Sequence, residues 1–474
     1  MIAQGLIAAL LLTQAGAVQP EGPQAIAGPT LSLEEALRQA QARNLDLKAA
    51  RERLLQSREL SAEAWSAYLP QVSASGTYTH NSYSDVTFPE QYAIRDCGTP
   101  GCFFDANGNP QPAPPPSGVG GTATTLGIVP VGPPAVIAKQ DALAAEVRAT
   151  QALLNPQAWY TIASARAGED LAAETTEGTR RDILFATAQA YYNAASLKQV
   201  VKVQERQLAI ALDHEKDARV RFDAGTTNRV TLLRAEIDRA RAEQDLKRAQ
   251  NAYISGRVAL ATLIDRKDVA FEVTVPPHPT LPEGDSQALE EAALKDRPDV
   301  KVSALQITVN EKNRNAVFSR YFPTLGAFGR YDYANTSGFS GVTSTWAVGL
   351  SLNFTLLDGL LRESDLRESE AKVREAVATD ASTRAKALQE VAQARLDLDS
   401  AIANRQKAKE ELAFAQENQR LVNVNYQAGT ATYLEVSDAN TALLQAELSE
   451  VSESLNADLA SLRVEKAVGA FDPR

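Results

Sequence analysis

The chain has 474 residues, of which 44% are hydrophobic and 6% aromatic, so Ala, Leu and Val supply most of the apolar content. This composition is typical of long helices that pack side by side. The net charge of -11 argues against a nucleic-acid partner, because no basic surface is available to neutralise phosphates.

The amino terminus has the pattern of a secretory signal peptide. An apolar run from Leu6 to Leu12 is followed by Ala15-Gly16-Ala17, an A-x-A cleavage pattern. We therefore expect residues 1–17 to be a signal peptide, although it lacks the usual basic residues before its apolar core. No later uncharged apolar stretch reaches the roughly 18 residues that a transmembrane helix needs, so any membrane crossing would use β-strands.

Residues 31–154 combine a helix, two strands and a loop. A helical pattern runs unbroken from about residue 31 to 66 and stops before Pro70, which cannot continue a helix. Alternating apolar and polar residues then predict strands at 72–79 and 143–150. The Pro- and Gly-rich residues between them, about 81–138, predict a long exposed loop.

This loop contains Cys97 and Cys102, the only two cysteines of the chain. In a secreted chain such a pair favours a local disulfide, and two free loop thiols are the alternative. A metal site is not expected, because the three histidines are scattered and none has ligand spacing with the cysteines.

A long helical hairpin follows the second strand. Asn155 is the expected N-cap and Pro156 the first residue of a helix that runs without a strong break to Gly225. Roughly 65 residues of helix measure about 100 Å. After the glycine, a return helix extends to about Ile264.

The second half of the chain repeats this plan after a Pro-rich connector at 265–286. A helix begins near residue 288, and strands are predicted at 324–333 and 346–356, the second being the clearest alternating pattern in the chain. Asp358 is the expected N-cap of another long helix, which runs to about residue 425 before Gly429 reverses it.

The two halves therefore look like two copies of one unit. "FDAGTT" and "YQAGTA" surround glycines that lie 204 residues apart, whereas the Pro70 and Pro323 breaks lie 253 apart, and the first-half loop accounts for the difference. We divide the chain into a signal peptide (1–17), a first repeat (18–264), the connector (265–286) and a second repeat (287–474).

Four strands cannot close a membrane barrel, and an open sheet edge in lipid leaves backbone groups unpaired at a cost of several kcal/mol each. Long helices with narrow apolar seams also cannot bury those seams within one chain. The predicted strands and helices therefore require several copies of the chain to assemble into one oligomer.

The chain resembles the TolC family of outer membrane efflux proteins over essentially its whole mature length. The resemblance rests on the duplication, on "YLPQV" and "YFPTL" where helix meets strand, on "LLNP" and "LLDG" where strand meets helix, and on the two glycine tips. It implies a homotrimer that combines a 12-stranded outer membrane β-barrel, four strands per protomer, with a long α-helical coiled-coil barrel in the periplasm.

The implied function is an exit duct of a tripartite efflux or type I secretion system. The resemblance implies contact with outer membrane lipid, a periplasmic adaptor (membrane fusion) protein and an inner-membrane pump of RND, ABC or MFS type, and it implies no cofactor. A periplasmic coiled-coil adaptor or structural protein without a channel is the alternative, although it leaves the strand pattern unexplained. The chain contains none of the common catalytic motifs, so we do not expect an enzyme.

The resemblance places the two glycine tips at the periplasmic end of the duct, where the adaptor docks. Their residues are Gly225 and Thr226 in the first half and Gly429 and Thr430 in the second. Gly225 and Gly429 supply the left-handed backbone that a tight reversal needs.

The resemblance also implies an acidic aperture built from Glu435 and Asp438, which would form two rings of carboxylates in a trimer and favour cations. A spacing of three residues puts both carboxylates on one helix face. Thr432 and Glu435 also fit a capping box, so helix capping is the competing interpretation.

Tyr426 matches a family tyrosine that helps to hold the aperture shut. The family's Arg and Asp partners are replaced by Ala431 and Thr231. Arg229 or Arg234 could supply substitute contacts.

Overall fold

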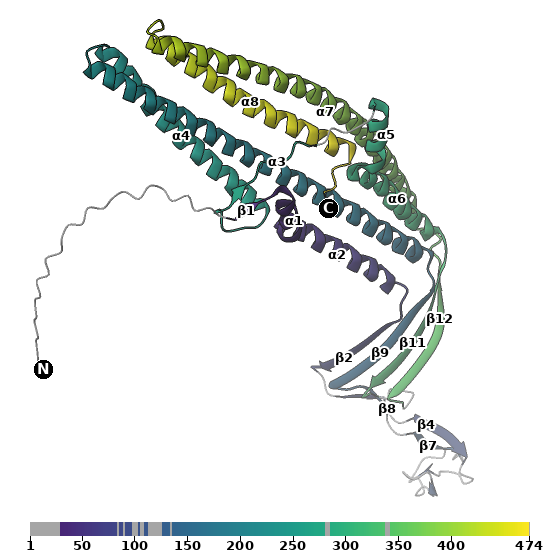
Figure 1. The fold of residues 1–474 in the computed structure, drawn as a ribbon. Helices are drawn as coiled ribbons and strands as arrows, with labels where there is room; N and C mark the ends of the chain where they lie inside the picture. The colour runs from purple at the N-terminus through teal and green to yellow at the C-terminus, as the bar shows by residue number, and fades with distance from the viewer. Residues whose placement is uncertain are drawn as a thin grey trace, which may run out of the picture. The chain divides into compact units, whose positions relative to one another are not determined.

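A computed structural model describes residues 29–82, 85–88, 91–96, 103–104, 109–111, 126–132, 135–279, 285–336 and 342–473 (Figure 1). The chain forms two compact units, and each draws on both halves of the sequence. Unit 1 comprises residues 1–51, 176–300 and 384–474, and unit 2 comprises residues 52–175 and 301–383. The signal peptide, Cys97 and Cys102 lie outside the described residues, and the proposed repeat boundaries stay a prediction.

Two helical hairpins dominate the chain (Figure 1). The first joins α3 (Pro156–Asp223) to α4 (Arg229–Leu263), and the second joins α7 (Leu361–Gln427) to α8 (Tyr433–Val468). The predicted start of α3 is confirmed, because Asn155 Oδ1 accepts a hydrogen bond from the Ala158 amide at 3.2 Å. The predicted N-cap of α7 is wrong: Gly359 and Leu360 have φ of 71° and 68°, so the helix begins three residues after Asp358.

Small side chains let the helices of the hairpins pack closely. Buried alanines recur every seven residues on all four helices, as in the seam of a coiled coil: Ala211 and Ala218, Ala235, Ala242 and Ala249, Ala387, Ala394, Ala401 and Ala408, and Ala439 and Ala446. Gly256 on α4 lies so close to α3 that a Cβ there would come within 2.9 Å of Leu197 Cδ1.

The first helical segment is interrupted, contrary to the predicted unbroken helix. It consists of α1 (Leu33–Arg43) and α2 (Leu45–Ser66), with Asn44 between them. Asn44 Oδ1 accepts hydrogen bonds from the Asp46 and Leu47 amides, while its Nδ2 donates to the Leu263 carbonyl at 2.9 Å. The break therefore exists because Asn44 caps α2 and ties it to the end of α4.

The corresponding segment of the second half is also divided. Here α5 (Ser286–Asp296) and α6 (Pro298–Phe318) are followed by the short 3-10 helix η1 (Ser319–Tyr321). Pro298 enforces the break, because the residue before a proline disfavours helical backbone.

The core of unit 1 forms where a two-stranded sheet lies against α3. Strand β1 (Thr30–Leu31) pairs in parallel with β10 (Glu272–Val273). The fully buried Tyr191 donates its hydroxyl hydrogen within this core, with the Leu31 carbonyl at 2.7 Å. The Thr274 carbonyl of the connector lies 3.0 Å from the same hydroxyl, so Tyr191 links both the start of the described chain and the connector to α3.

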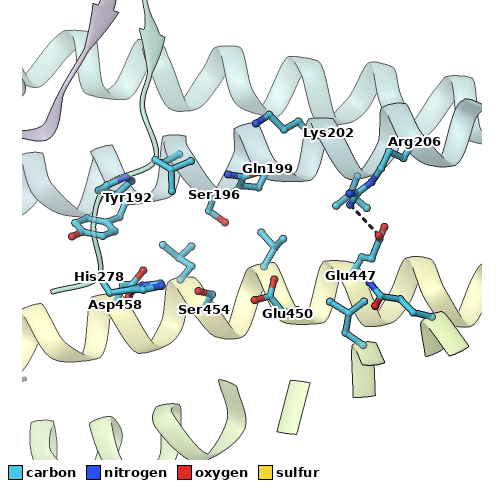
Figure 2. A pocket seen from close by; sticks show the side chains of 18 residues that line it. Tyr192, Ser196, Gln199, Lys202, Arg206, His278, Glu447, Glu450, Ser454 and Asp458 are labelled. Atoms are coloured by element: carbon cyan, nitrogen blue, oxygen red, sulfur yellow. Dashed lines mark hydrogen bonds and ion pairs between the residues drawn. The ribbon is translucent and has the colours of Figure 1, made fainter. Parts of the chain in front are cut away.

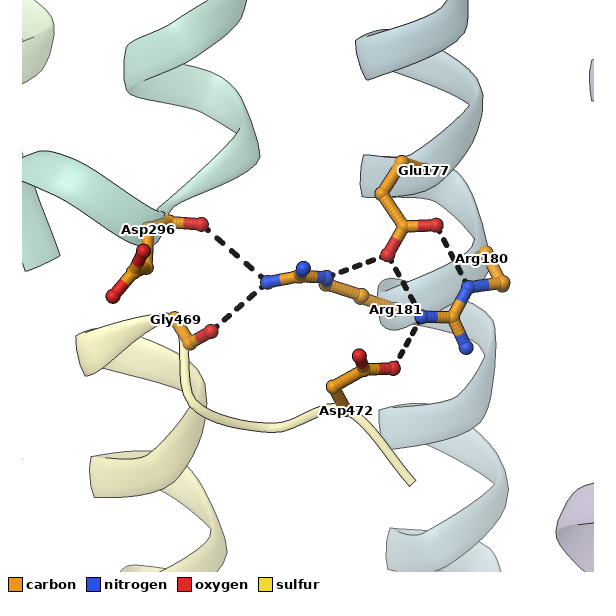
Figure 3. Close-up of polar contacts among 6 residues, drawn as sticks. All are labelled: Glu177, Arg180, Arg181, Asp296, Gly469 and Asp472. Atoms are coloured by element: carbon orange, nitrogen blue, oxygen red, sulfur yellow. Dashed lines mark hydrogen bonds and ion pairs between the residues drawn. The ribbon is translucent and has the colours of Figure 1, made fainter. Parts of the chain in front are cut away.

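A network of charged side chains fixes the C-terminal segment of unit 1 (Figure 3). Arg180 contacts both Glu177 and Asp472. Arg181 donates to the carbonyls of Gly469 at 2.9 Å and Asp296 at 3.4 Å. Since those carbonyls lie at the C-terminal ends of α8 and α5, Arg181 satisfies groups that the helices leave unpaired.

Unit 2 contains an antiparallel sheet with the strand order β12-β11-β9-β2 (Figure 1). Its strands are β2 (Gln71–His80), β9 (Asp141–Leu154), β11 (Thr324–Ala334) and β12 (Ser344–Asn353). All four predicted strands are confirmed, although β12 ends at Asn353 and not at the predicted residue 356. The edge strands β2 and β12 each pair with one neighbour among the described strands.

The two faces of this sheet differ in chemistry. On one face the register aligns Trp346, Tyr331, Val147 and Ala74, and on β12 the side chains of Trp346, Val348, Leu350 and Leu352 are 68–74% exposed. The other face aligns Thr345, Asp332, Glu146 and Ser75. The sheet thus presents an exposed apolar face opposite a charged one.

The predicted long loop at 81–138 contains short strand pairs among its described residues, which the sequence analysis did not predict. β3 (Val86–Phe88) pairs with β8 (Ala135–Ala138), β4 (Gln91–Asp96) with β7 (Leu126–Gly132), and β5 (Phe103–Phe104) with β6 (Pro110–Gln111). Among the described residues, no helix combines the length and the apolar character needed to cross a membrane.

Candidate functional site

The two hairpin tips reverse the chain with the same hydrogen bonds. At the first tip Gly225 has φ 71°, and the Thr226 amide and hydroxyl both donate to the Arg221 carbonyl. At the second tip Gly429 has φ 75°, and Thr430 bonds in the same way to Asn425. This is the pattern that closes a helix with a left-handed glycine, as the sequence predicted.

The two tips differ in how the return helices α4 and α8 are capped at their N-termini. Asn228 caps α4 through the Thr231 amide at 2.9 Å. Thr432 caps α8, where Glu435 Oε2 accepts from the Thr432 amide at 2.6 Å and completes a capping box. These hydrogen bonds from Thr432 lower the pKa of the Glu435 carboxyl, which keeps its charge at the helix N-terminus.

Asp438 lies one turn beyond Glu435, and both side chains are exposed. Val436, Ala439 and Asn440 are buried, so the two carboxylates occupy the helix face directed away from the packing contacts. The structure thus brings Glu435 and Asp438 to one solvent-facing surface, while also giving Glu435 a capping role.

Tyr426 contacts the first hairpin through Arg221. The guanidinium carbon lies 4.6 Å from the centre of the tyrosine ring, and Arg221 Nε also pairs with Asp217 at 2.8 Å. The cation beside Tyr426 is therefore Arg221, whereas the sequence suggested Arg229 or Arg234.

A second contact between the hairpins involves residues that the sequence analysis did not single out. Asp238 on α4 accepts hydrogen bonds from Tyr433 Oη at 3.0 Å and Ser437 Oγ at 3.2 Å, both on α8. The pKa of Tyr433 is raised by burial first and by the Asp238 carboxylate second, so this phenol remains a donor. No sequence motif distinguishes Asp238 from the other acidic residues of the helices.

A third contact joins α3, α8 and α7. Asn440 Nδ2 lies 3.1 Å from His214 Nε2, and Asn440 Oδ1 accepts from Gln419 Nε2 at 3.2 Å. Burial lowers the pKa of His214, against the opposing effect of Asp217, Asp213 and Asp238. This arrangement needs a neutral His214 whose Nε2 is the acceptor.

A polar cavity of 420 Å³ lies between α3 and α8 in unit 1 (Figure 2). His278 of the connector enters it, with Nδ1 at 2.8 Å from Asp458 Oδ1. Burial raises the pKa of Asp458, and His278 partly offsets this effect. Arg206 and Glu447 pair at 2.9 Å at the other end of the cavity.

Neither the tips nor the cavity holds a metal-ligand set. Within the described ranges, no group of three or more His, Cys, Asp and Glu side chains is arranged to hold a metal ion. The polar groups described at the tips instead form the hydrogen bonds of turns, helix caps and contacts between helices.

Comparison with solved structures defines the class of fold. A crystal structure of CusC matches with a TM-score of 0.71 at 16% identity, over 96% of this chain and 95% of that chain. The outer membrane protein VceC of Vibrio cholerae matches with a TM-score of 0.70 at 18% identity, over 92% and 96%. The chain therefore shares the fold of CusC and VceC.

Comparison with protein sequences gives matches over part of the chain. Residues 289–470 match the family model described as outer membrane efflux protein. The outer membrane efflux protein BepC of Brucella suis biovar 1 is 23% identical over 305 residues, 62% of this chain. The matched region spans 65% of BepC, slightly less than two thirds of its length.

Proposed function

We propose that three copies of this chain form an outer membrane duct that carries substrates from an inner-membrane pump across the periplasm to the outside. The duct acts as a channel and not as an enzyme. The match of residues 289–470 to the outer membrane efflux protein family and the fold shared with CusC and VceC over more than nine tenths of the chain support this function.

The observation that carries the proposal is the sheet of unit 2. Its apolar face exposes Trp346 and Val348 by 73% and 74%, which suits contact with lipid and not with water. Among the described strands, β2 and β12 at the edges of the sheet each have one partner, and an unpaired edge is costly in lipid. Joining β2 of one copy to β12 of the next would pair these edges, and three copies would close twelve strands.

The charged face of the sheet would then line the lumen. Arg148 pairs with Glu146 at 2.6 Å, and Arg330 with Asp332 at 3.3 Å. Charged side chains are tolerated on the inner surface of such a closed sheet because that surface is hydrated.

We also propose that Glu435 and Asp438 line the periplasmic aperture of the duct, with Tyr426 holding it narrow. The solvent-facing position of both carboxylates supports this role. We also propose that a periplasmic adaptor docks at Gly225, Thr226, Gly429 and Thr430. The exposure of these four tip residues supports it. The inner-membrane pump that this duct serves is proposed to be of the RND, ABC or MFS class.

Fractionation of cells and reconstitution of the purified protein test the duct. We expect the chain in the outer membrane fraction after a carbonate wash, a trimeric mass by light scattering in detergent, and discrete conductance steps in planar bilayers. An adaptor or structural protein would leave the membrane in the wash and would not conduct. A folded trimer that never conducts would also contradict the duct.

A further inference from the structure

The charged face of the sheet in unit 2 places like charges side by side. Between β9 and β11 the register aligns Arg148 with Arg330, and two residues further along it aligns Glu146 with Asp332. Like charges that lie directly opposite each other on neighbouring strands are destabilising. The sheet by itself therefore does not favour this arrangement, which points to a role in contacting another molecule.

Ion pairs along each strand offset the repulsion but use only part of each guanidinium group. Arg148 contacts Glu146 through Nε at 2.6 Å, and Arg330 contacts Asp332 through Nε at 3.3 Å. Among the described residues, the terminal nitrogens of both arginines have no hydrogen-bond or ion-pair partner. These nitrogens carry most of the N–H donors of an arginine, and both side chains are about half exposed.

Small side chains flank the two arginines and leave the space above them open. In the same row of the register, Ser73 of β2 lies beside Arg148, and Ala347 of β12 lies beside Arg330. Neither side chain is long enough to cover a guanidinium group. A carboxylate, sulfonate or phosphate group can therefore approach both arginines together, and guanidinium groups bind such anions through two parallel hydrogen bonds.

An aromatic ring lies in the row next to the arginines. Phe328 precedes Arg330 by two residues, so both side chains lie on one face of the sheet, about 7 Å apart along the strand. The Phe328 ring lies over Gly349, where a Cβ would come within 2.8 Å of its Cζ, yet Phe328 is still 37% exposed. The other members of its row are Gln71 and Thr150. An exposed apolar surface thus adjoins the cationic row.

The acidic row lies on the other side of the arginines. Glu146 and Asp332 are half-buried, and their carboxylates repel an anion that approaches from that side. An anion bound by the arginines would therefore direct its apolar part toward Phe328. The order of ring, cations and carboxylates along the strands matches a molecule that has an aromatic body and an anionic group.

We propose that Arg148, Arg330 and Phe328 form a binding site for aromatic anions on the inner wall of the duct. The carboxylate, sulfonate or phosphate group of the ligand contacts the two guanidinium groups, and its ring packs against Phe328. Aromatic surface combined with a few convergent polar groups is typical of sites for small molecules. This inference rests on the proposed duct function and adds a chemical class of substrate.

Pyranine, a fluorescent pyrene that carries three sulfonate groups, tests the site through its fluorescence anisotropy with the purified protein in a neutral detergent. For Arg148→Gln, Arg330→Gln we expect the affinity to fall at least about tenfold, because hydrogen bonds between charged groups are lost. The matched control Arg248→Gln, Arg420→Gln removes two exposed, ion-paired arginines from α4 and α7 and should bind like the wild type. Wild-type affinity in the test variant, or an equal loss in the control, would overturn the proposal.

The contribution of the ring is tested by comparing two anions. Citrate carries three carboxylates but no ring, so it should displace pyranine from the wild type only weakly. Phe328→Leu keeps an apolar side chain over Gly349, and it should lower the affinity for pyranine about threefold without changing that for citrate. Phe414→Leu, at an exposed position of α7, is the control. Equal effects on the two anions, or no effect on either, would contradict a site for aromatic anions.

A lysine variant keeps the test valid if the glutamine variant does not fold, which circular dichroism would show. Arg148→Lys, Arg330→Lys keeps both charges but loses the planar groups that bind an anion through two hydrogen bonds. It should bind pyranine less tightly than the wild type. A lysine variant as tight as the wild type would contradict the proposed contact with the guanidinium groups.

Conductance in planar bilayers, measured on the same proteins, separates this site from the duct. If the wild type conducts but its affinity for pyranine does not depend on the two arginines, the site is wrong and the duct stands. If a folded wild type binds pyranine as expected but never conducts, the duct is wrong, and the location of the site inside a lumen is wrong with it.

Discussion

Tyr433 and Asp238 lie 195 positions apart in the sequence, and a hydrogen bond of 3.0 Å joins their side chains. One belongs to α8 and the other to α4, so the bond links the second hairpin to the first. Thr432 and Glu435, which lie beside Tyr433 in the sequence, cap α8. The same short segment therefore combines local helix capping with long-range attachment.

Neutralising the solvent-facing carboxylates should change ion selectivity. For Glu435→Gln, Asp438→Asn we expect a cation-selective conductance to lose most of its preference, because rings of carboxylates attract cations at a constriction. Reversal potentials in asymmetric KCl measure this. The control Glu205→Gln, Asp223→Asn removes two exposed carboxylates from α3. Unchanged selectivity in the double variant would contradict the aperture role and leave Glu435 and Asp438 with helix capping and contact with solvent.

Alanine at the second tip should destabilise the protein. Gly429 has φ 75°. For a residue with a Cβ, this left-handed backbone is less favourable by about 1–2 kcal/mol of conformational free energy. We expect Gly429→Ala to lower the melting temperature measured by circular dichroism. Gly168→Ala is the control, because Gly168 lies within α3 with open space around it, and alanine there should be neutral or stabilising by up to about 1 kcal/mol. A Gly429→Ala protein as stable as the wild type would argue against this strain.

Acidification should weaken the contact around His214. Its pKa is lowered by burial from the ordinary value of 6.5, so the folded protein favours the neutral ring more than the unfolded chain does. Stability should therefore be lost as the pH falls below about 6.5 and level off below the folded pKa. Melting temperatures at pH 7.5 and 5.5 measure the loss, which should be smaller in His214→Gln. An identical loss in both proteins would exclude His214 as its source.

The carboxyl of Glu177 should make a separate contribution at lower pH. Its hydrogen bond with Arg180, assisted by Arg181, lowers its pKa to about 2 despite partial burial. Its stabilising effect is thus complete above about 4.5 and is lost as the pH falls toward 2. We expect acid unfolding of Glu177→Gln to lose less stability over this range than the wild type, with Glu174→Gln on the same helix as the control. Parallel curves for all three proteins would contradict this role.

The periodic part of the fold could be predicted from sequence, because strands and long helices follow from local patterns. Strand β11 (Thr324–Ala334) and helix α3, starting at Pro156, agree with the prediction at their first residues. The break at Asn44 could not be found this way, since its side chain bonds to the carbonyl of Leu263, 219 positions away. The late start of α7 also escaped prediction, because Leu360 adopts a positive φ that its residue type disfavours.

The candidate site was predictable only where its bonds are local. The Gly225 and Gly429 reversals and the Thr432–Glu435 capping box follow from short motifs. Asp238 is different, because nothing in the sequence states which acidic residue of α4 faces α8. Its role depends on how two helices pack, which the sequence period alone does not specify.

The two reversals share their hydrogen bonds, yet the residues that join the hairpins have no counterparts in the other half. At the offset of 204 that relates the two glycines, Asp238 corresponds to Ala442 and Tyr433 to Arg229. The bond can therefore form in one direction only, from the second hairpin to the first. A ring of three chains would contain six hairpins with two alternating kinds of junction, so its symmetry would be threefold and never sixfold. Duplication would thus have supplied six similar helical hairpins per ring. Later sequence divergence would have determined which adjacent hairpins are joined by side-chain bonds and which can separate.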